Sequence, residues 1–298
     1  MALIPVRTVT PPLQPLRVSD LWPGMVAAVS FAICNVLSKL VLAAGSDVLT
    51  LSLFRGLVGV ALLFIWLTAV SQPSPLTPRA RLISLGLGLL FAGVVFGLFA
   101  AISIVTVPIA VLTYFIYPLL TGIAGALLGI DKVGWRGVVA AVVAFIGLAL
   151  MIRAHPQQLA WSGLAFAIGA AVCRTAILLV TQSQLQDSDP QLTTWYLILS
   201  STAILAAAAL LTWNWHAPGT PSGWVALIAI SAGTTISVLA LFESIRRVGP
   251  FRSALIMYLE PLLSTLLSGP VAGEAITLTQ ALGGSIMLAA LVGFQLRR

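Results

Sequence analysis

One short segment near the end of the chain places two unusual residues side by side in an apolar stretch. The segment MYLEPLL puts Glu260 directly before Pro261, among residues that are mainly Val, Ser, Ala, Leu, Ile and Thr. A buried carboxylate can hold a cation or carry a proton, and a proline inside a helix removes a backbone hydrogen bond and kinks the helix. The pair is the first candidate for chemistry. Its alternative role is a buried ion pair that braces two helices.

Further polar groups lie in the middle of apolar runs, where ionisable side chains are costly and mark candidate sites. Arg174 could clamp the carboxylate of a substrate or pair with an acidic group of the protein. Asn35 is followed one helical turn later by Lys39, which could act as a second cation or extend outward to the membrane surface.

The helix face that carries Glu260 is predicted to be polar over several turns. Ser253, Met257, Ser264 and Ser268 share this face with Glu260, at spacings of 4, 3, 4 and 4 residues. This spacing predicts one continuous stripe, which is too long to serve a single salt bridge.

The composition identifies an integral membrane protein. Of 298 residues, 59% are hydrophobic and 8% are charged, with a mean hydropathy of +1.08, whereas soluble domains carry about a quarter charged residues. The net charge of +7 does not indicate nucleic-acid binding, because the basic residues are scattered in pairs between apolar runs. Cys34 and Cys173 offer neither a disulfide framework nor a metal site, and we expect no cofactor.

Ten apolar runs are long enough to cross a bilayer, which takes about 20 helical residues. These runs are too long for the strands of a barrel, and their apolar and polar residues do not alternate as barrel strands require. We therefore predict an all-α integral membrane fold. We expect a flexible cytoplasmic tail over residues 1–20, a first five-helix repeat over 21–152 and a second over 153–298. The predicted spans are 21–44, 47–70, 81–102, 107–128, 133–152, 159–184, 191–212, 222–245, 248–269 and 275–296.

The distribution of Lys and Arg predicts the orientation of these spans. One side of the membrane receives the basic residues of both termini and of most basic loops, while the opposite side receives Arg153 alone. Because positive charges concentrate on the cytoplasmic side, we expect both termini in the cytoplasm.

The two halves of the chain contain the same motif. Residues 117–131, YPLLTGIAGALLGID, align with residues 260–274, EPLLSTLLSGPVAGE, at an offset of 143, and CN at 34–35 aligns with CR at 173–174 at an offset of 139. A five-span unit repeated in one chain must enter the membrane in opposite directions, which is the inverted repeat of many transporters. Pro118 and Pro261 occupy equivalent positions, and each is predicted to kink its helix. The kink could act as a hinge, free a backbone carbonyl for substrate, or serve helix packing alone.

The first half has its own counterpart of the polar stripe, formed by Ala110, Tyr114, Tyr117, Thr121 and Gly125. If the two faces meet across a pseudo-twofold axis, they line a central cavity with hydroxyls, phenols and one carboxylate. The predicted substrate-binding residues are Asn35, Lys39, Tyr114, Tyr117, Arg174, Met257, Tyr258 and Glu260.

The segment EPLLSTLLSGPVAGEAITLTQALGGSIMLAA, on the ninth of ten helices, resembles the drug/metabolite transporter superfamily. It is most similar to the EamA-type exporters, in which E-P and a later G-E precede a Gly-rich last helix, and among these to bacterial aromatic amino-acid exporters. The resemblance covers residues 21–296 and implies a central cavity lined by spans one, three, four, six, eight and nine, with export of amino acids without ATP. The first half has Tyr117 where the family motif has Glu, so only the carboxylate of Glu260 is carried over.

We therefore predict a secondary transporter that exports aromatic and other neutral amino acids across a bacterial inner membrane by alternating access. Arg174 or Lys39 would meet the substrate carboxylate, Glu260 its ammonium, and the tyrosines its side chain. A proton is a candidate coupling ion, membrane lipid is the other expected partner, and we expect a monomer. The sequence shows no H-E-x-x-H, P-loop or intramembrane Ser/His constellation, which argues against an enzyme or an ATP-driven pump. The alternatives are a carrier of drugs, lipophilic cations or nucleotide sugars with the same fold, and a channel or membrane sensor.

Overall fold

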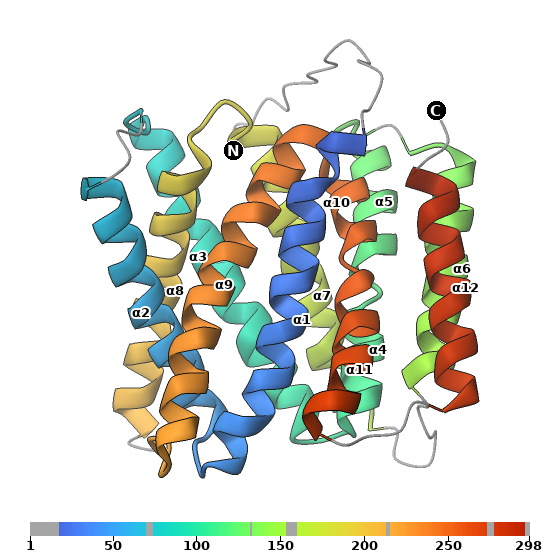
Figure 1. Cartoon of the computed structure of the whole chain (residues 1–298). Coiled ribbons are helices and arrows are strands. Elements are labelled where there is room, and N and C mark those ends of the chain that lie inside the picture. Colours follow the sequence, from blue (N-terminus) through green and yellow to red (C-terminus); the bar gives the residue numbers. More distant parts are fainter. Residues whose placement is uncertain are drawn as a thin grey trace.

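The computed structural model of the chain describes residues 18–69, 74–131, 133–152, 160–212, 215–272 and 277–295, and within these residues it is a bundle of helices without a strand (Figure 1). The predicted all-α fold is confirmed. A 3-10 turn at Val18–Asp20 precedes helices α1 (Trp22–Ala43), α2 (Val48–Ala69), α3 (Pro78–Ile102), α4 (Val107–Tyr114), α5 (Tyr117–Leu127), α6 (Trp135–Ile152), α7 (Trp161–Gln184), α8 (Pro190–Thr212), α9 (Pro221–Val248), α10 (Pro250–Ile256), α11 (Leu259–Ala272) and α12 (Leu278–Gln295).

These helices make ten crossings of the bundle in the described part of the chain, because α4 with α5 and α10 with α11 each form one broken crossing. Most crossings are long and apolar enough to span a membrane, and α12 is a shorter apolar helix. Successive crossings alternate in direction (Figure 1), so the five crossings of the second half are inverted relative to those of the first. The chain is a multi-pass membrane protein with two inverted five-helix repeats.

The two breaks lie just before the prolines rather than at them. Phe115 and Ile116 leave the helix before α5, in which Pro118 is the second residue, and Met257 and Tyr258 leave it before α11, in which Pro261 is the third. A proline at the start of a helix costs no hydrogen bond, since the first N–H groups of a helix have no partner within it. Each proline therefore lies in the first turn after a two-residue interruption. The backbone there stays close to helical, with φ −69° and ψ −16° at Ile116 and φ −65° and ψ −13° at Met257.

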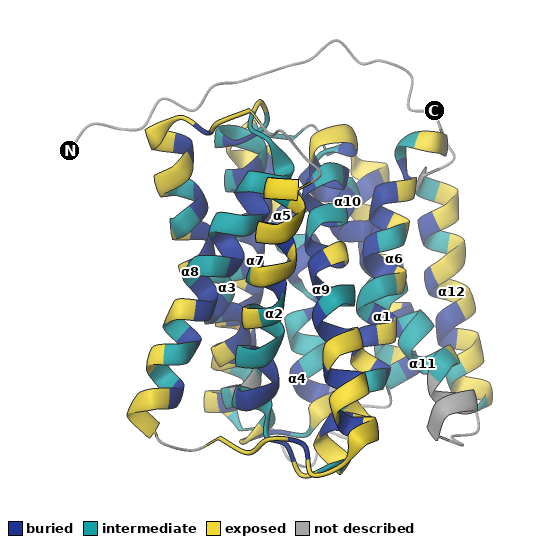
Figure 2. Ribbon diagram, turned by 60° about the vertical axis from the view of Figure 1, so that its left-hand side comes forward, coloured by how far each residue is buried: buried dark blue, intermediate teal, exposed yellow. Residues whose placement is uncertain are grey.

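The two halves interlock instead of forming separate bodies. From the first half, α1 packs against α9 and α11, and α3 packs against α7 and α8. Helices α6 and α12, the last crossing of each half, pair with one another at one edge of the bundle (Figure 1). Buried positions lie on the inside of the bundle and exposed ones on its outside (Figure 2). Many of the exposed residues are large and apolar, which a lipid environment tolerates.

Candidate transport site at the pseudo-twofold axis

The two helix breaks meet at the centre of the bundle. Phe115 lies in the first break and Tyr258 in the second, and they are 143 residues apart, which is the offset of the repeat. Their rings stack with centroids 6.1 Å apart and planes inclined by 29°. The Tyr258 hydroxyl donates a hydrogen bond of 3.1 Å to the Phe115 carbonyl. Because equivalent residues of two repeats touch only near the axis that relates them, the pseudo-twofold axis passes between these rings.

On one side of this axis, α11 is hydrogen-bonded to α1. The Asn35 side-chain amide donates a hydrogen bond of 2.9 Å to Oε1 of Glu260. Asn35 is exposed and Glu260 is half-buried, although each lies far from the ends of its crossing. Lys39 is exposed one turn beyond Asn35, toward the end of the bundle opposite the chain termini. The structure therefore brings together two of the predicted site residues at a position that a ligand can reach.

On the other side of the axis, α7 meets α5. Arg174 is 5% exposed, and its guanidinium carbon lies 5.8 Å from the ring centroid of Tyr117 and 5.9 Å from that of Phe31. Among the described residues, neither the Arg174 Nε nor the Tyr117 hydroxyl has a hydrogen-bond partner of good geometry, and both atoms are buried. A buried donor without an acceptor is costly. This side of the site is therefore suited to receive an acceptor oxygen from a ligand.

These two contacts are equivalent in the repeat. Arg174 corresponds to Asn35 (174 − 35 = 139), and Glu260 corresponds to Tyr117 (260 − 117 = 143). Each contact thus joins a broken helix of one half to the first helix of the other, and each contains one charged and one neutral side chain. The charges of Arg174 and Glu260 interact through space but form no ion pair within 4.0 Å. A cation and an anion therefore face a common centre without neutralising one another directly.

The third feature of the site is an aromatic wall beside Arg174. Tyr114 is half-buried, and its ring lies 5.4 Å from that of Phe115 and 5.3 Å from that of Tyr117, between centroids. With Phe31 on α1, these rings surround the guanidinium with polarisable surface. Such a wall suits an apolar or aromatic group of a ligand.

Two further residues predicted to bind substrate are fully buried. Met257 and Tyr258 are both 0% exposed, and Ser253 is buried with its hydroxyl 2.8 Å from that of Ser244 on α9. Arg174 and Tyr117 are almost as deeply buried, so burial does not distinguish these residues. The binding of substrate by Met257 and Tyr258 stays a prediction.

The carbonyls at the breaks also have partners. The Tyr117 carbonyl accepts hydrogen bonds from the hydroxyls of Thr121 at 2.8 Å and Thr175 at 3.3 Å. In the second half, the Met257 carbonyl accepts from the Glu260 backbone N–H at 3.1 Å. Met257 lies four residues before Pro261, so its carbonyl is the one that this proline leaves without a helical partner, and the Glu260 N–H occupies it.

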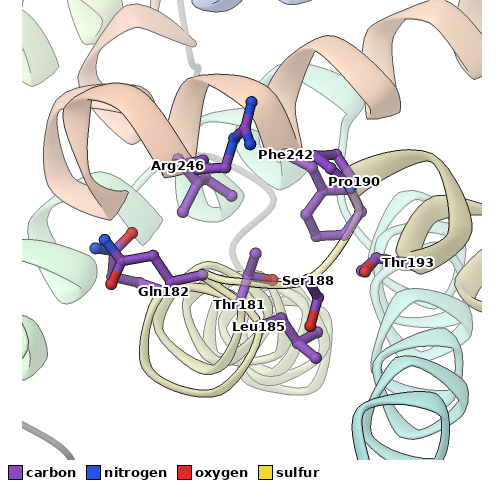
Figure 3. A pocket seen from close by; sticks show the side chains of 10 residues that line it. Thr181, Gln182, Leu185, Ser188, Pro190, Thr193, Phe242 and Arg246 are labelled. Atoms are coloured by element: carbon purple, nitrogen blue, oxygen red, sulfur yellow. The ribbon is translucent and has the colours of Figure 1, made fainter. Parts of the chain in front are cut away.

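The end of the bundle that carries the chain termini is closed. Asp131 accepts a hydrogen bond of 3.2 Å from the backbone N–H of Phe251 at the start of α10, and α5 packs along α10. A pocket at this end, between α7, α8 and α9 and lined by Thr181, Gln182 and Arg246 among others, has a volume of about 10 Å³ (Figure 3). That volume holds about one water molecule and excludes a metabolite.

The two broken crossings pack against one another unevenly along their length. Helices α5 and α10 are in contact on the side of the termini, whereas α4 and α11 have no comparable contact over their described lengths.

Sequence reasoning overlooked three residues of this site. Phe31 lies one helical turn before Asn35 on the same face of α1, and Phe115 is the repeat counterpart of Tyr258, so both had a detectable signal. Thr175 had none, because a hydroxyl beside an apolar run identifies no partner.

A multi-pass bundle of two inverted repeats, with opposite charges at the axis, defines a membrane transporter of small metabolites. The model of the EamA-like transporter family matches this chain twice, over residues 21–153 and 161–295, and the chain belongs to that family. The family is one of transporters and not of enzymes. One solved structure, described simply as the crystal structure of a protein, superposes with a TM-score of 0.81 at 18% identity, covering 94% of this chain and 98% of that one, and shares its fold. No curated protein matches the chain.

Proposed function

We propose that this transporter exports neutral amino acids, aromatic ones among them, across a bacterial inner membrane with both termini in the cytoplasm. The observation that carries the proposal is the separation of Arg174 and Glu260 across the pseudo-twofold axis without an ion pair. An amino acid carries a carboxylate and an ammonium on one carbon, and it would place the first at Arg174 and the second at Glu260. Its side chain would lie against Tyr114 and Tyr117.

Transport would proceed by alternating access around this fixed site. The broken crossings α4–α5 and α10–α11 would rock against one another at the Phe115–Tyr258 contact, and Pro118 and Pro261 would keep each break in place. Support comes from the asymmetry of the structure, in which α5 and α10 pack at the closed end while α4 and α11 have no comparable contact over their described lengths. In the opposite state the closed contacts of α10, including the Asp131 bond to Phe251, would open.

Coupling to protons would fall on Glu260, because it is the one carboxylate at the axis among the described residues. Asn35 donates a hydrogen bond to Oε1 of this side chain and would have to release it when an ammonium group binds there. Facilitated export needs no such step, so the pH dependence of counterflow distinguishes the two modes.

The test is uptake and counterflow of phenylalanine, methionine and threonine in proteoliposomes containing the wild type, Glu260→Gln and the control Glu243→Gln. Glu243 pairs with Arg246 and Arg247 at the closed end and should be dispensable. We expect saturable flux that the Glu260 variant loses and the control keeps. If none of the three amino acids moves, the substrate class is wrong, and if Glu260→Gln transports normally, its role is wrong.

The same assay separates the alternative functions. A carrier of lipophilic cations would need Glu260 but tolerate Arg174→Gln. A channel would show flux that neither saturates nor shows counterflow.

A further inference from the structure

A groove on the outside of the bundle, remote from the transport site, has the chemistry of a second binding site. It lies between α6 and α12 at the end that carries the termini, with α10 beside it, and has a volume of about 450 Å³. Its walls are apolar and include Val139, Val143, Ala289 and Gly293, and Arg136 and Arg252 also line it. In Figure 1 this helix pair forms the edge of the bundle.

The sequence explains why a groove forms between these two helices. At their middle, α6 and α12 touch backbone to backbone, since a Cβ on Gly147 would lie 2.7 Å from the Gly283 carbonyl oxygen. Toward the termini, the ring of Phe294 fills the space beside Gly137 instead. Ala289 and Gly293 are exposed on α12 and offer almost no side chain, so the surface between the helices stays hollow.

Two arginines lie at one end of this groove, of which Arg252 also interacts electrostatically with Asp131. The guanidinium of Arg136 lies 5.8 Å from the ring of Trp135, and that of Arg252 lies 5.2 Å from the ring of Phe294. Trp135 is 72% exposed, and exposed tryptophans at helix ends lie at the level of the lipid headgroups. The arginines therefore stand at headgroup level, above an apolar channel that continues into the hydrocarbon layer.

We propose that this groove binds an anionic phospholipid of the leaflet on the terminus-bearing side. The phosphate contacts Arg136 and Arg252, and an acyl chain lies over Ala289 and Gly293. Basic pockets between transmembrane helices suit anionic headgroups. A second copy of the chain fits less well, because a symmetric pair through this face would bring the arginines of both copies together. The proposal concerns a different ligand and surface from the transport function and stands without it.

Native mass spectrometry of delipidated protein tests the proposal, with phosphatidylglycerol and phosphatidylcholine of identical acyl chains as probes. We expect preferential retention of phosphatidylglycerol, weakened about fivefold by Arg136→Gln and more by the double variant with Arg252→Gln. The control is Arg81→Gln, which removes another arginine over an aromatic ring, Tyr196, at 5.5 Å and at the same end of the bundle. Equal retention of the two lipids, or equal losses in Arg81→Gln and Arg136→Gln, overturns the proposal.

A second variant tests the acyl part of the groove with both arginines in place. Ala289→Leu fills the channel from an exposed position, so the fold tolerates it, and it should lower retention of both lipids. Unchanged retention in this variant contradicts the assignment of the groove. The wild type could instead form a dimer without lipid, and Ala289→Leu could dissociate it. That outcome would identify a second copy of the chain as the occupant of the groove and overturn the lipid site.

Discussion

The two contacts that flank the pseudo-twofold axis are equivalent in position and opposite in chemistry. Asn35 and Glu260 join α1 to α11 through a hydrogen bond of 2.9 Å, while Arg174 and Tyr117 join α7 to α5 through a guanidinium 5.8 Å from a ring. The first contact is accessible and satisfied, and the second is buried with unpartnered polar atoms. The repeat thus provides one framework, in which different residues at equivalent positions leave a carboxylate on one side of the axis and a guanidinium on the other.

This difference distinguishes the features that the two halves share from the charged residues that only one half carries. The helix breaks and the stacked rings of Phe115 and Tyr258 occur in both halves or on the axis itself, so the proposed motion would use them. Both charges come from the second half, and both neutral partners from the first. The proposed recognition of substrate would therefore depend on residues that the repeat does not share.

The largest expected effect comes from removing the positive charge of Arg174. Arg174→Gln should weaken phenylalanine binding by about 2 kcal/mol, or about thirtyfold, because the substrate carboxylate loses a desolvated charge partner. Phenethylamine, which lacks the carboxylate, should bind the variant and the wild type within about threefold. Competition for phenylalanine counterflow measures both values, with Arg81→Gln as the control. Equal losses for the two ligands would show that Arg174 supports the fold rather than the carboxylate.

A second substitution alters the contact between Phe115 and Tyr258 at the axis and leaves Arg174 and Glu260 in place. Tyr258→Phe removes the hydrogen bond to the Phe115 carbonyl but keeps the stacked ring, and it should cost about 1 kcal/mol of stability. Thermal unfolding in detergent measures this cost, and substrate affinity should stay within about twofold. A large loss of affinity with unchanged stability would show that the Tyr258 hydroxyl contributes to substrate binding, as the sequence predicts.

The sequence was sufficient to predict which residues occupy equivalent positions in the two halves. It was not sufficient to predict which side chains touch. The offsets of the repeat identified Asn35 with Arg174 and Tyr117 with Glu260, and the apolar runs gave the ten spans. The contacts were not predictable, because they join side chains of helices far apart in the sequence, as in the hydrogen bond from Asn35 to Glu260. The burial of Met257 and Tyr258 depends on the same long-range packing.

A hydrogen-bonded contact far from the axis should affect the stability of the fold but not the binding of substrate. Asp47, in the loop between α1 and α2, accepts hydrogen bonds from the Thr50 N–H and hydroxyl at 2.9 Å and 2.6 Å and from the His216 N–H at 2.8 Å. Burial raises the pKa of this carboxyl, but the hydrogen bonds from Thr50 and His216 outweigh it and hold the pKa below its ordinary value. Its stabilisation is therefore complete above the unfolded pKa of about 3.9 and is lost as the pH falls through the folded value.

Asp47→Asn should accordingly cost about 1 kcal/mol near neutral pH and less as the pH approaches 3. Thermal unfolding from pH 6 to pH 3 checks this, with flux at neutral pH as the second readout. Parallel curves for variant and wild type would contradict the role of Asp47.

The smallest expected effect concerns the neutral partner of Arg174. Tyr117→Phe removes a buried hydroxyl that has no hydrogen-bond partner of good geometry among the described residues and keeps the ring beside the guanidinium. Stability should be unchanged or slightly raised, because an unsatisfied buried polar group is lost, and amino-acid affinity should fall less than about threefold. Unfolding and counterflow measure the two quantities. A loss as large as that of Arg174→Gln would show that the phenol itself holds the substrate, and the two sides of the axis would then differ less than their charges indicate.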